Sequence, residues 1–191
     1  MKSNSNIKHI FEQSAKIILD SEILEKEILT SISLITTAVK TGKKIIIFGN
    51  GGSAADSQHL AGEFIGRYLL ERKSFPAIAL TTDTSILTAI GNDYGFEKIF
   101  ARQCEALVKK GDIVIAISTS GNSKNVIQGM ITAKKLGAKT ISLCGRNFSK
   151  IKKYSDIVIA VPSKETPRIQ ESHRTIIHII CQIVEKQLRN I

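Results

Sequence analysis

Five short apolar runs, separated by longer segments with helical periodicity, constrain the fold of this 191-residue chain more than any other feature. The runs are rich in β-branched residues and too short for helices, as is typical of parallel strands covered on both faces. They span residues 44–48, 77–80, 113–117, 140–144 and 157–161. Between and after them we expect helices over 53–68, 85–90 with 96–108, 125–136 and 167–189. This order predicts an α/β fold with a doubly wound, five-stranded parallel sheet.

A helical segment of about forty residues precedes this alternation. Apolar side chains at helical spacing predict one long helix or two between Ile7 and about Lys40, and Asp20–Ser21 is the interruption that we favour. Gly42 ends the segment. Because the length suits one hydrophobic core and no linker or repeat divides the chain, we expect a single domain over residues 1–191.

The charge balance restricts the classes of partner. Lys and Arg number 27 against 17 Asp and Glu, but the basic residues occur as scattered pairs without interleaved aromatic residues. We interpret them as a solvated surface that attracts anions, and we expect no nucleic-acid partner. No apolar run approaches the roughly 20 residues of a membrane span, so we expect no membrane partner either. The N-terminus lacks an apolar signal core, and the three cysteines lack CxxC spacing, which indicates reduced thiols in the cytoplasm.

Two polar loops follow the first and third apolar runs, where a doubly wound sheet binds its ligands. Residues 49–53 (GNGGS) lead into a helix and let the backbone approach an anion, although a simple tight turn explains the glycines equally well. Residues 118–123 (STSGNS) offer four hydroxyl groups, which exceed the need of one helix cap and suit a phosphate dianion. We therefore favour a phosphate site at the second loop.

Two pairs of polar side chains on different predicted helices are candidates for a metal site or for acid–base catalysis. His59 and Glu63 lie one turn apart on one helix face, either as a metal half-site or acid–base pair, or as an ordinary exposed pair. In the last helix, His178 lies outside the apolar stripe and Gln170 at its edge. Eight residues on an ideal helix span about 12 Å. One ion therefore binds both only if the helix deforms near Pro167 or if the two side chains come from different subunits.

The last helix carries two further structural signals. Thr166 followed by Pro167 predicts its start, with the threonine hydroxyl as the cap and the proline at the first helical position. His173 lies within the apolar stripe of the same helix, and we interpret it as a core histidine whose hydrogen bonds are satisfied.

Together these segments resemble the phosphoheptose isomerases of the sugar isomerase (SIS) domain family. The resemblance covers nearly the whole chain and rests on several motifs in the same order. They are GNGGSAAD (49–56), the pair His59-x-x-x-Glu63, GNDYGFEKIFARQ (91–103), STSGNS (118–123) and TPRIQESH-x4-H (166–178). The STSGNS loop is general to SIS domains, whereas the His59/Glu63 and Gln170/His178 pairs distinguish this branch.

The resemblance implies a flavodoxin-like SIS fold and a cytoplasmic homotetramer in which residues 1–42 pack between subunits. It implies conversion of D-sedoheptulose 7-phosphate to D-glycero-D-manno-heptose 7-phosphate through an enediol, the first step of nucleotide-activated heptose synthesis for lipopolysaccharide or capsule. The residues that match the family's substrate contacts are Asn50, Gly51, Gly52, Ser53, Glu63, Asn92, Asp93, Ser118, Thr119, Ser120, Ser123 and Gln170. Those that match its ligands for one zinc ion per subunit are His59, Glu63, Gln170 and His178. Glu63 is the expected catalytic base and His178 the expected acid.

Two other functions are compatible with the fold. A SIS-fold protein that binds the bacterial replication initiator shares the fold and the tetramer, but it needs no acid–base and metal set. An isomerase of another sugar phosphate is harder to distinguish, because the shape of the pocket sets the length of the sugar.

Overall fold

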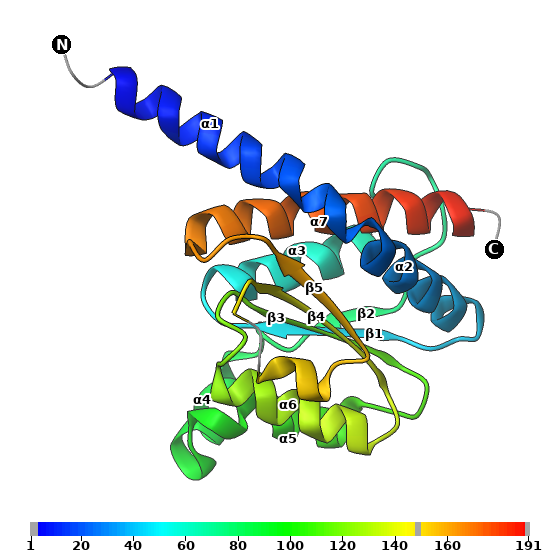
Figure 1. The fold of residues 1–191 in the computed structure, drawn as a ribbon. Helices are drawn as coiled ribbons and strands as arrows, with labels where there is room; N and C mark the ends of the chain where they lie inside the picture. Colours follow the sequence, from blue (N-terminus) through cyan, green and yellow to red (C-terminus); the bar gives the residue numbers. More distant parts are fainter. Residues whose placement is uncertain (1–3, 148–149, 190–191) are drawn as a thin grey trace.

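The computed structural model describes residues 4–147 and 150–189; residues 1–3 of the predicted N-terminal segment lie outside this range. Five strands form one sheet in the order β2-β1-β3-β4-β5, and all neighbours are parallel (Figure 1). The strands are β1 (Ile45–Gly49), β2 (Ala77–Ala79), β3 (Ile113–Ser118), β4 (Lys139–Gly145) and β5 (Ile157–Val161). The predicted doubly wound, five-stranded α/β fold is confirmed.

Helices cover both faces of the sheet (Figure 1). On one face lie α2 (Glu25–Lys40), α3 (Gly52–Ile65) and α7 (Thr166–Leu188). On the other lie α4 (Thr84–Tyr94), α5 (Ile99–Leu107) and α6 (Lys124–Lys135), with the short 3₁₀ segments η2 (Phe96–Lys98) and η3 (Ile151–Tyr154). Because strand side chains alternate between faces, Ile47 joins the first core and Phe48 the second.

The expectation that all five runs are covered on both faces is wrong for the edge strands. β1 and β3 are buried along their whole length, as the pattern predicts. In β2, however, Ile78 is 39% exposed, and in β5 the residues alternate between buried and half-buried. An edge strand has a neighbour on one side only, and the helices leave part of its surface open.

The N-terminal segment forms α1 (Asn4–Asp20), η1 (Ser21–Leu24) and α2, so the two-helix version of the prediction is confirmed. Where the helix is interrupted, the Ser21 hydroxyl donates to the carbonyl oxygen of Ile17 over 2.7 Å. α1 extends away from the sheet and reaches the rest of the chain mainly through α7 (Figure 1). Phe11 on α1 is 72% exposed and Ile23 in η1 is 77% exposed. A large part of the apolar surface of this segment is therefore uncovered within one chain.

α7 differs from the prediction in two details. It begins at Thr166 with Glu165 in the N-cap position, so Thr166 is not the cap, although Pro167 occupies the first turn as expected. His173 is fully buried, with Nε2 3.2 Å from the Cys144 carbonyl oxygen, but its Nδ1 has no partner among the described residues. Burial lowers the pKa of His173 to about 4. The prediction that His173 is a core residue is therefore confirmed, but only one of its two ring nitrogens has a hydrogen-bond partner among the described residues.

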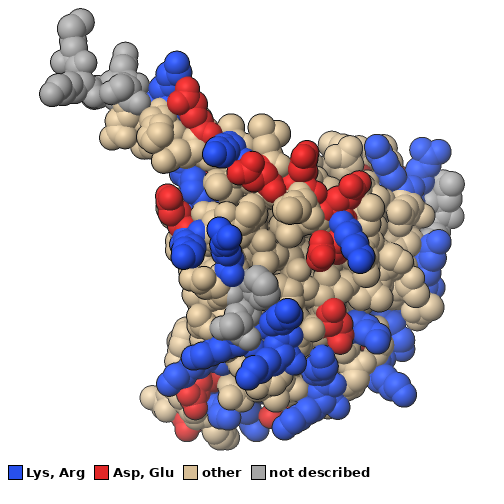
Figure 2. Space-filling model, viewed as in Figure 1, with Lys and Arg blue, Asp and Glu red and all other residues tan. Residues whose placement is uncertain are grey.

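Two surface properties were also expected from composition. On the face drawn in Figure 2, Lys and Arg side chains occur in both the upper and the lower part, and several acidic side chains lie among them in the upper part. Within residues 4–147 and 150–189, no helix combines the length and the hydrophobicity that crossing a bilayer requires.

Candidate functional site

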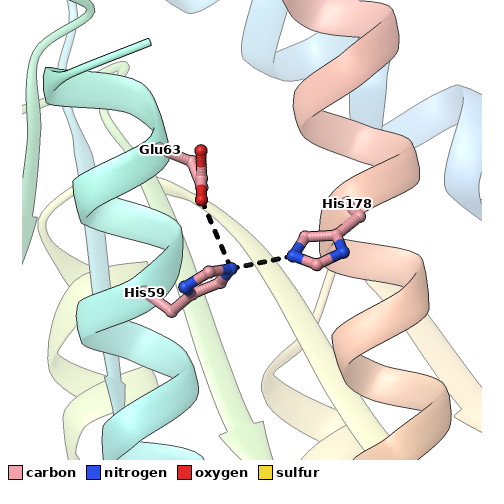
Figure 3. A group of neighbouring side chains, drawn as sticks. All are labelled: His59, Glu63 and His178. Atoms are coloured by element: carbon pink, nitrogen blue, oxygen red, sulfur yellow. Dashed lines mark hydrogen bonds and ion pairs between the residues drawn. The ribbon is translucent and has the colours of Figure 1, made fainter. Parts of the chain in front are cut away.

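Three polar side chains from α3 and α7 meet on one side of the sheet (Figure 3). Nε2 of His59 lies 2.8 Å from Nε2 of His178 and 3.4 Å from Oε1 of Glu63. One ligand atom from each residue lies within 4.8 Å of the other two, and all three side chains are half-buried. The structure therefore brings the predicted imidazole–carboxylate pair of α3 to the predicted histidine of α7 within one chain.

The packing of α3 against α7 explains why these residues meet. The two helices lie side by side over the sheet, and Leu60 of α3 and Ile177 of α7 belong to the same buried core. Residues three or four apart share a helix face, so the contacts recur along both helices in the same direction. These contacts join Gly52 with Gln170, Asp56 with Arg174, and His59 with His178.

Burial and a nearby cation favour the neutral form of His59. Desolvation lowers the pKa of His59, and the guanidinium of Arg174 lowers it further. Arg174 is itself held by Asp56, with Nη2 2.6 Å from Oδ1. The two Nε2 atoms lie at hydrogen-bond distance, so one of them donates its hydrogen and the other accepts with an unprotonated nitrogen. At least one imidazole nitrogen therefore offers a lone pair.

The donor set of His59, Glu63 and His178 fits a zinc ion. Two imidazole nitrogens and one carboxylate oxygen are a usual set of three protein ligands, which leaves a fourth position open. The close approach of the two nitrogens and the carboxylate is compatible with binding to one ion.

Gln170 does not join this group within one chain. Its side chain lies against Gly52 at the start of α3, where a Cβ atom added to Gly52 would collide with the Gln170 amide. α7 is one continuous helix from Thr166 to Leu188, so no deformation near Pro167 brings Gln170 to His178. Of the two arrangements that the sequence left open, only ligands from different subunits would place Gln170 at the same ion.

The STSGNS loop after β3 keeps most of its hydroxyl groups away from helix capping. Oγ of Ser118 lies 3.2 Å from Oγ of Ser123, and the backbone N–H of Asn122 donates to Oγ of Ser120 over 3.2 Å. Ser123 occupies the N-cap position of α6, yet its side chain makes no capping hydrogen bond. The loop therefore contains an ST turn at Ser120, as the structural alternative predicts, but the N-cap hydroxyl of Ser123 does not cap α6.

A cavity of about 150 Å³ adjoins this loop at the carboxyl edge of the sheet. It is lined by Thr119, Ser120, Asn122, Arg146, Asn147, Ser163, Lys164, Thr166 and Ile169. No described carboxylate lines it, so two cations face the hydroxyl groups without a competing anion. Sequence patterns did not indicate Arg146 or Lys164; the one available signal was that each closely follows a predicted strand.

The remaining predicted substrate contacts lie in two separate places, one directly after β1 and one near the end of α4. Asn50 is half-buried directly after β1, and Gly51 has a φ of 56°, a left-handed conformation that turns the chain into α3. Asn92 and Asp93 are exposed near the end of α4 and hydrogen-bonded to each other over 2.8 Å. Among the described residues, no hydrogen bond or ion pair joins these two to His59, Glu63 or His178.

A family model and curated relatives identify the family of this chain. A family model described as "SIS domain" matches residues 10–145. The phosphoheptose isomerase of Geotalea daltonii is 56% identical over 165 residues, 86% of each chain. That of Aquifex aeolicus is 53% identical over 183 residues, 95% of this chain and 96% of the relative.

Solved structures agree with this result. The structure of phosphoheptose isomerase GmhA from Neisseria gonorrhoeae superposes with a TM-score of 0.91 at 40% identity, covering 96% of this chain and 98% of that chain. One from Francisella tularensis gives a TM-score of 0.93 at 34% identity, covering 97% and 100%. The fold and these relatives together show that the chain belongs to the phosphoheptose isomerases of the SIS domain family, and is a sugar-phosphate isomerase.

Proposed function

We propose that this chain converts D-sedoheptulose 7-phosphate to D-glycero-D-manno-heptose 7-phosphate, the first step toward nucleotide-activated heptose for lipopolysaccharide or capsule. The observation that carries the proposal is the contact of His59 with Glu63 and His178 in a chain whose relatives are named phosphoheptose isomerases. A protein that only binds the replication initiator needs no such acid–base group.

The proposed reaction moves hydrogen between two neighbouring carbons through an enediol. The carboxylate of Glu63 removes a proton from C1, next to the ketone, while His178 donates a proton to the oxygen at C2. The imidazole then takes the proton of the C1 hydroxyl, and Glu63 returns a proton to C2 to give the aldose. An imidazole suits this exchange because it gains and loses a proton near neutral pH.

The phosphate and the sugar would be held at the carboxyl edge of the sheet. The proposed phosphate contacts are Ser118, Thr119, Ser120 and Ser123, supported by the hydroxyl-rich loop and the cationic cavity beside it. The proposed sugar contacts are Asn50, Gly51, Gly52, Ser53, Asn92, Asp93 and Gln170. We add Arg146 to this set as a source of positive charge for the phosphate dianion.

We also propose that each subunit holds one zinc ion between His59, Glu63 and His178, with Gln170 of a neighbouring subunit as the fourth ligand. A zinc ion bound there would polarise the carbonyl group and stabilise the enediolate. The donor set and the mutual distances of the three side chains support the proposal.

Zinc binding can be measured without any assay of activity. Protein treated with a chelator and dialysed against zinc is expected to bind one ion per chain, and His59→Ala is expected to weaken binding at least about tenfold. His9, an exposed histidine of α1, provides the matched control His9→Ala, which should bind like the wild type. No zinc in the wild type, or equal losses in both variants, would contradict the metal site.

We propose that residues 1–191 form a single SIS domain that assembles as a homotetramer, with residues 1–42 packed between subunits. An apolar groove of about 800 Å³ between the N-terminal helices and α7 supports this, because contiguous uncovered apolar surface is typical of protein interaction sites. Ile23 and Ile179 line the groove and are exposed in the single chain. Sedimentation equilibrium measures the assembly, and a monomer at micromolar concentration would contradict it.

The three cysteines support a reducing compartment, which we propose to be the cytoplasm. Cys104, Cys144 and Cys181 are free and buried, and burial raises the pKa of each thiol to about 12. Such thiols stay protonated and resist oxidation.

Purified protein incubated with sedoheptulose 7-phosphate and followed by NMR tests the proposed reaction. We expect the aldose signal to appear and solvent deuterium to enter at the carbon that is reprotonated. Parallel incubations with a pentose phosphate and a hexosamine phosphate test the alternative substrates, and turnover of one of these alone would overturn the proposal. Repetition after chelation separates a metal-dependent reaction from a metal-independent one.

Ser120→Ala is expected to raise KM about tenfold or more and to change kcat little. A hydroxyl bound to a charged phosphate contributes about 1.5–3 kcal/mol, and a uniform loss of binding appears in KM. Ser74→Ala, at an exposed serine near the amino end of β2, is the control and should have no effect. A collapse of kcat at unchanged KM would show that Ser120 does not anchor the phosphate.

A further inference from the structure

A reciprocal pair of side-chain amides joins the loop after β1 to the start of α6. Nδ2 of Asn50 donates to Oδ1 of Asn125 over 2.9 Å, and Nδ2 of Asn125 donates to Oδ1 of Asn50 over 2.8 Å. β1 and β3 are neighbours, and the helices that follow them, α3 and α6, cover opposite faces of the sheet. The pair therefore spans the switch point of the sheet, where doubly wound folds bind ligands.

One backbone group fixes the orientation of both amides. The N–H of Val126 donates to Oδ1 of Asn125 over 2.9 Å, and because an N–H only donates, the atom that it meets must be the oxygen. Nδ2 of Asn125 then points at Asn50, so Asn50 must present its oxygen to Asn125. A flip of either amide would place two donors or two acceptors against each other.

Asn125 is more deeply buried than Asn50. It is 3% exposed, whereas Asn50 is half-buried and is one of the proposed sugar contacts. Outside the pair, the amide of Asn50 keeps one hydrogen and one oxygen lone pair. Because Asn125 determines which end of the Asn50 amide faces which way, a sugar hydroxyl meets a donor and an acceptor that are already oriented.

We propose that Asn125 is a positioning residue for the isomerisation, which acts on the substrate only through the amide of Asn50. The inference rests on the proposed function, because it names a role in that reaction. It also predicts a dependence between two residues that are 75 positions apart in the sequence.

A double-mutant cycle tests the dependence. Asn50→Ala and Asn125→Ala are each expected to lower kcat/KM about tenfold to a hundredfold, and the double variant is expected to lose no more than the larger single loss. If Asn125 mattered only for folding, Asn125→Ala would lower kcat/KM by the same factor in the Asn50→Ala background as in the wild type. Multiplied losses in the double variant would therefore overturn the inference.

A second substitution keeps the test independent of a folding defect. Asn125→Asp preserves the volume and the acceptor for Val126, but it turns a second acceptor toward the Asn50 oxygen. We expect kcat/KM to fall about tenfold while inhibition by inorganic phosphate, which reports the phosphate loop, stays unchanged. The matched control is Gln128→Glu, the same chemical change on α6 at a side chain without a hydrogen bond among the described residues.

The outcomes separate this inference from the proposed function. If Asn125→Asp is as active as Gln128→Glu, Asn125 has no positioning role, while the activity of the wild type still supports the proposed reaction. If the wild type does not isomerise the sugar phosphate, the proposed function fails, and the positioning role falls with it.

Discussion

Glu63→Gln is expected to lower kcat about a thousandfold or more and to leave binding of the sugar phosphate largely intact. A general base contributes about 10²–10⁴-fold to proton transfer, and an amide of the same shape does not accept a proton at neutral pH. The phosphate contacts lie on other elements, so ligand affinity should persist. The measurements are kcat by NMR, wash-in of solvent deuterium, and the Kd of the substrate by calorimetry.

The zinc content of the same variant decides why activity is lost. Glu63 is both the proposed base and a proposed metal ligand, and glutamine is a weaker ligand than glutamate. A variant that keeps its zinc but loses turnover and deuterium wash-in identifies Glu63 as the base. Glu105→Gln, an exposed glutamate of α5 paired with Arg102, is the control and should retain full activity. Near-normal turnover in Glu63→Gln would show that Glu63 is not the catalytic base.

The strands and most helices were predictable because local periodicity reports which faces are buried. Burial itself depends on neighbours, and this is where local patterns failed. Ile78 sits in an apolar run like those of the central strands, yet β2 lies at the edge of the sheet. α3 ends at Ile65 and not at the predicted Tyr68, because the N–H of Tyr68 donates to Glu185 on α7 and does not continue the helix.

The candidate site was predictable in part, for a similar reason. One helical turn separates His59 from Glu63, so their proximity follows from local geometry. The approach of His178 depends on how α7 packs against α3, which no local pattern reports; the resemblance to a family supplied it. Arg146 and Lys164 are ordinary charged loop residues in the sequence, and only the meeting of three strand ends places them at one cavity.

α7 also carries a buried carboxylate, Glu185, which contacts the segment after α3 and which no sequence motif indicated. Glu185 is 1% exposed and accepts the backbone N–H groups of Tyr68, Leu69 and Leu70 over 2.7–2.8 Å. Nε of Arg72 lies 3.2 Å from the same carboxylate. Glu185 therefore holds the segment after α3 against α7.

Glu185→Gln is expected to lower the free energy of unfolding by about 3–5 kcal/mol at pH 7, because it leaves Arg72 buried without its anion and turns an amide N–H toward backbone donors. Desolvation raises the pKa of Glu185, but the three backbone N–H groups and Arg72 outweigh it and hold the pKa below its ordinary value. The stabilisation is therefore complete above the pKa of an unfolded-chain glutamate, about 4.3, and is lost as the pH falls through the lower pKa of the folded protein.

Chemical denaturation at a series of pH values measures both effects. The difference between wild type and Glu185→Gln should be largest at neutral pH and should shrink steadily below about pH 4.3, since the protonated wild-type carboxyl resembles the amide. Glu71→Gln is the matched control, because its side chain is 92% exposed and pairs with Arg67 at the surface, where an ion pair contributes about 0–1 kcal/mol. Equal destabilisation by the two substitutions, or a difference independent of pH, would mean that the buried carboxylate does not fasten α7 to the segment after α3.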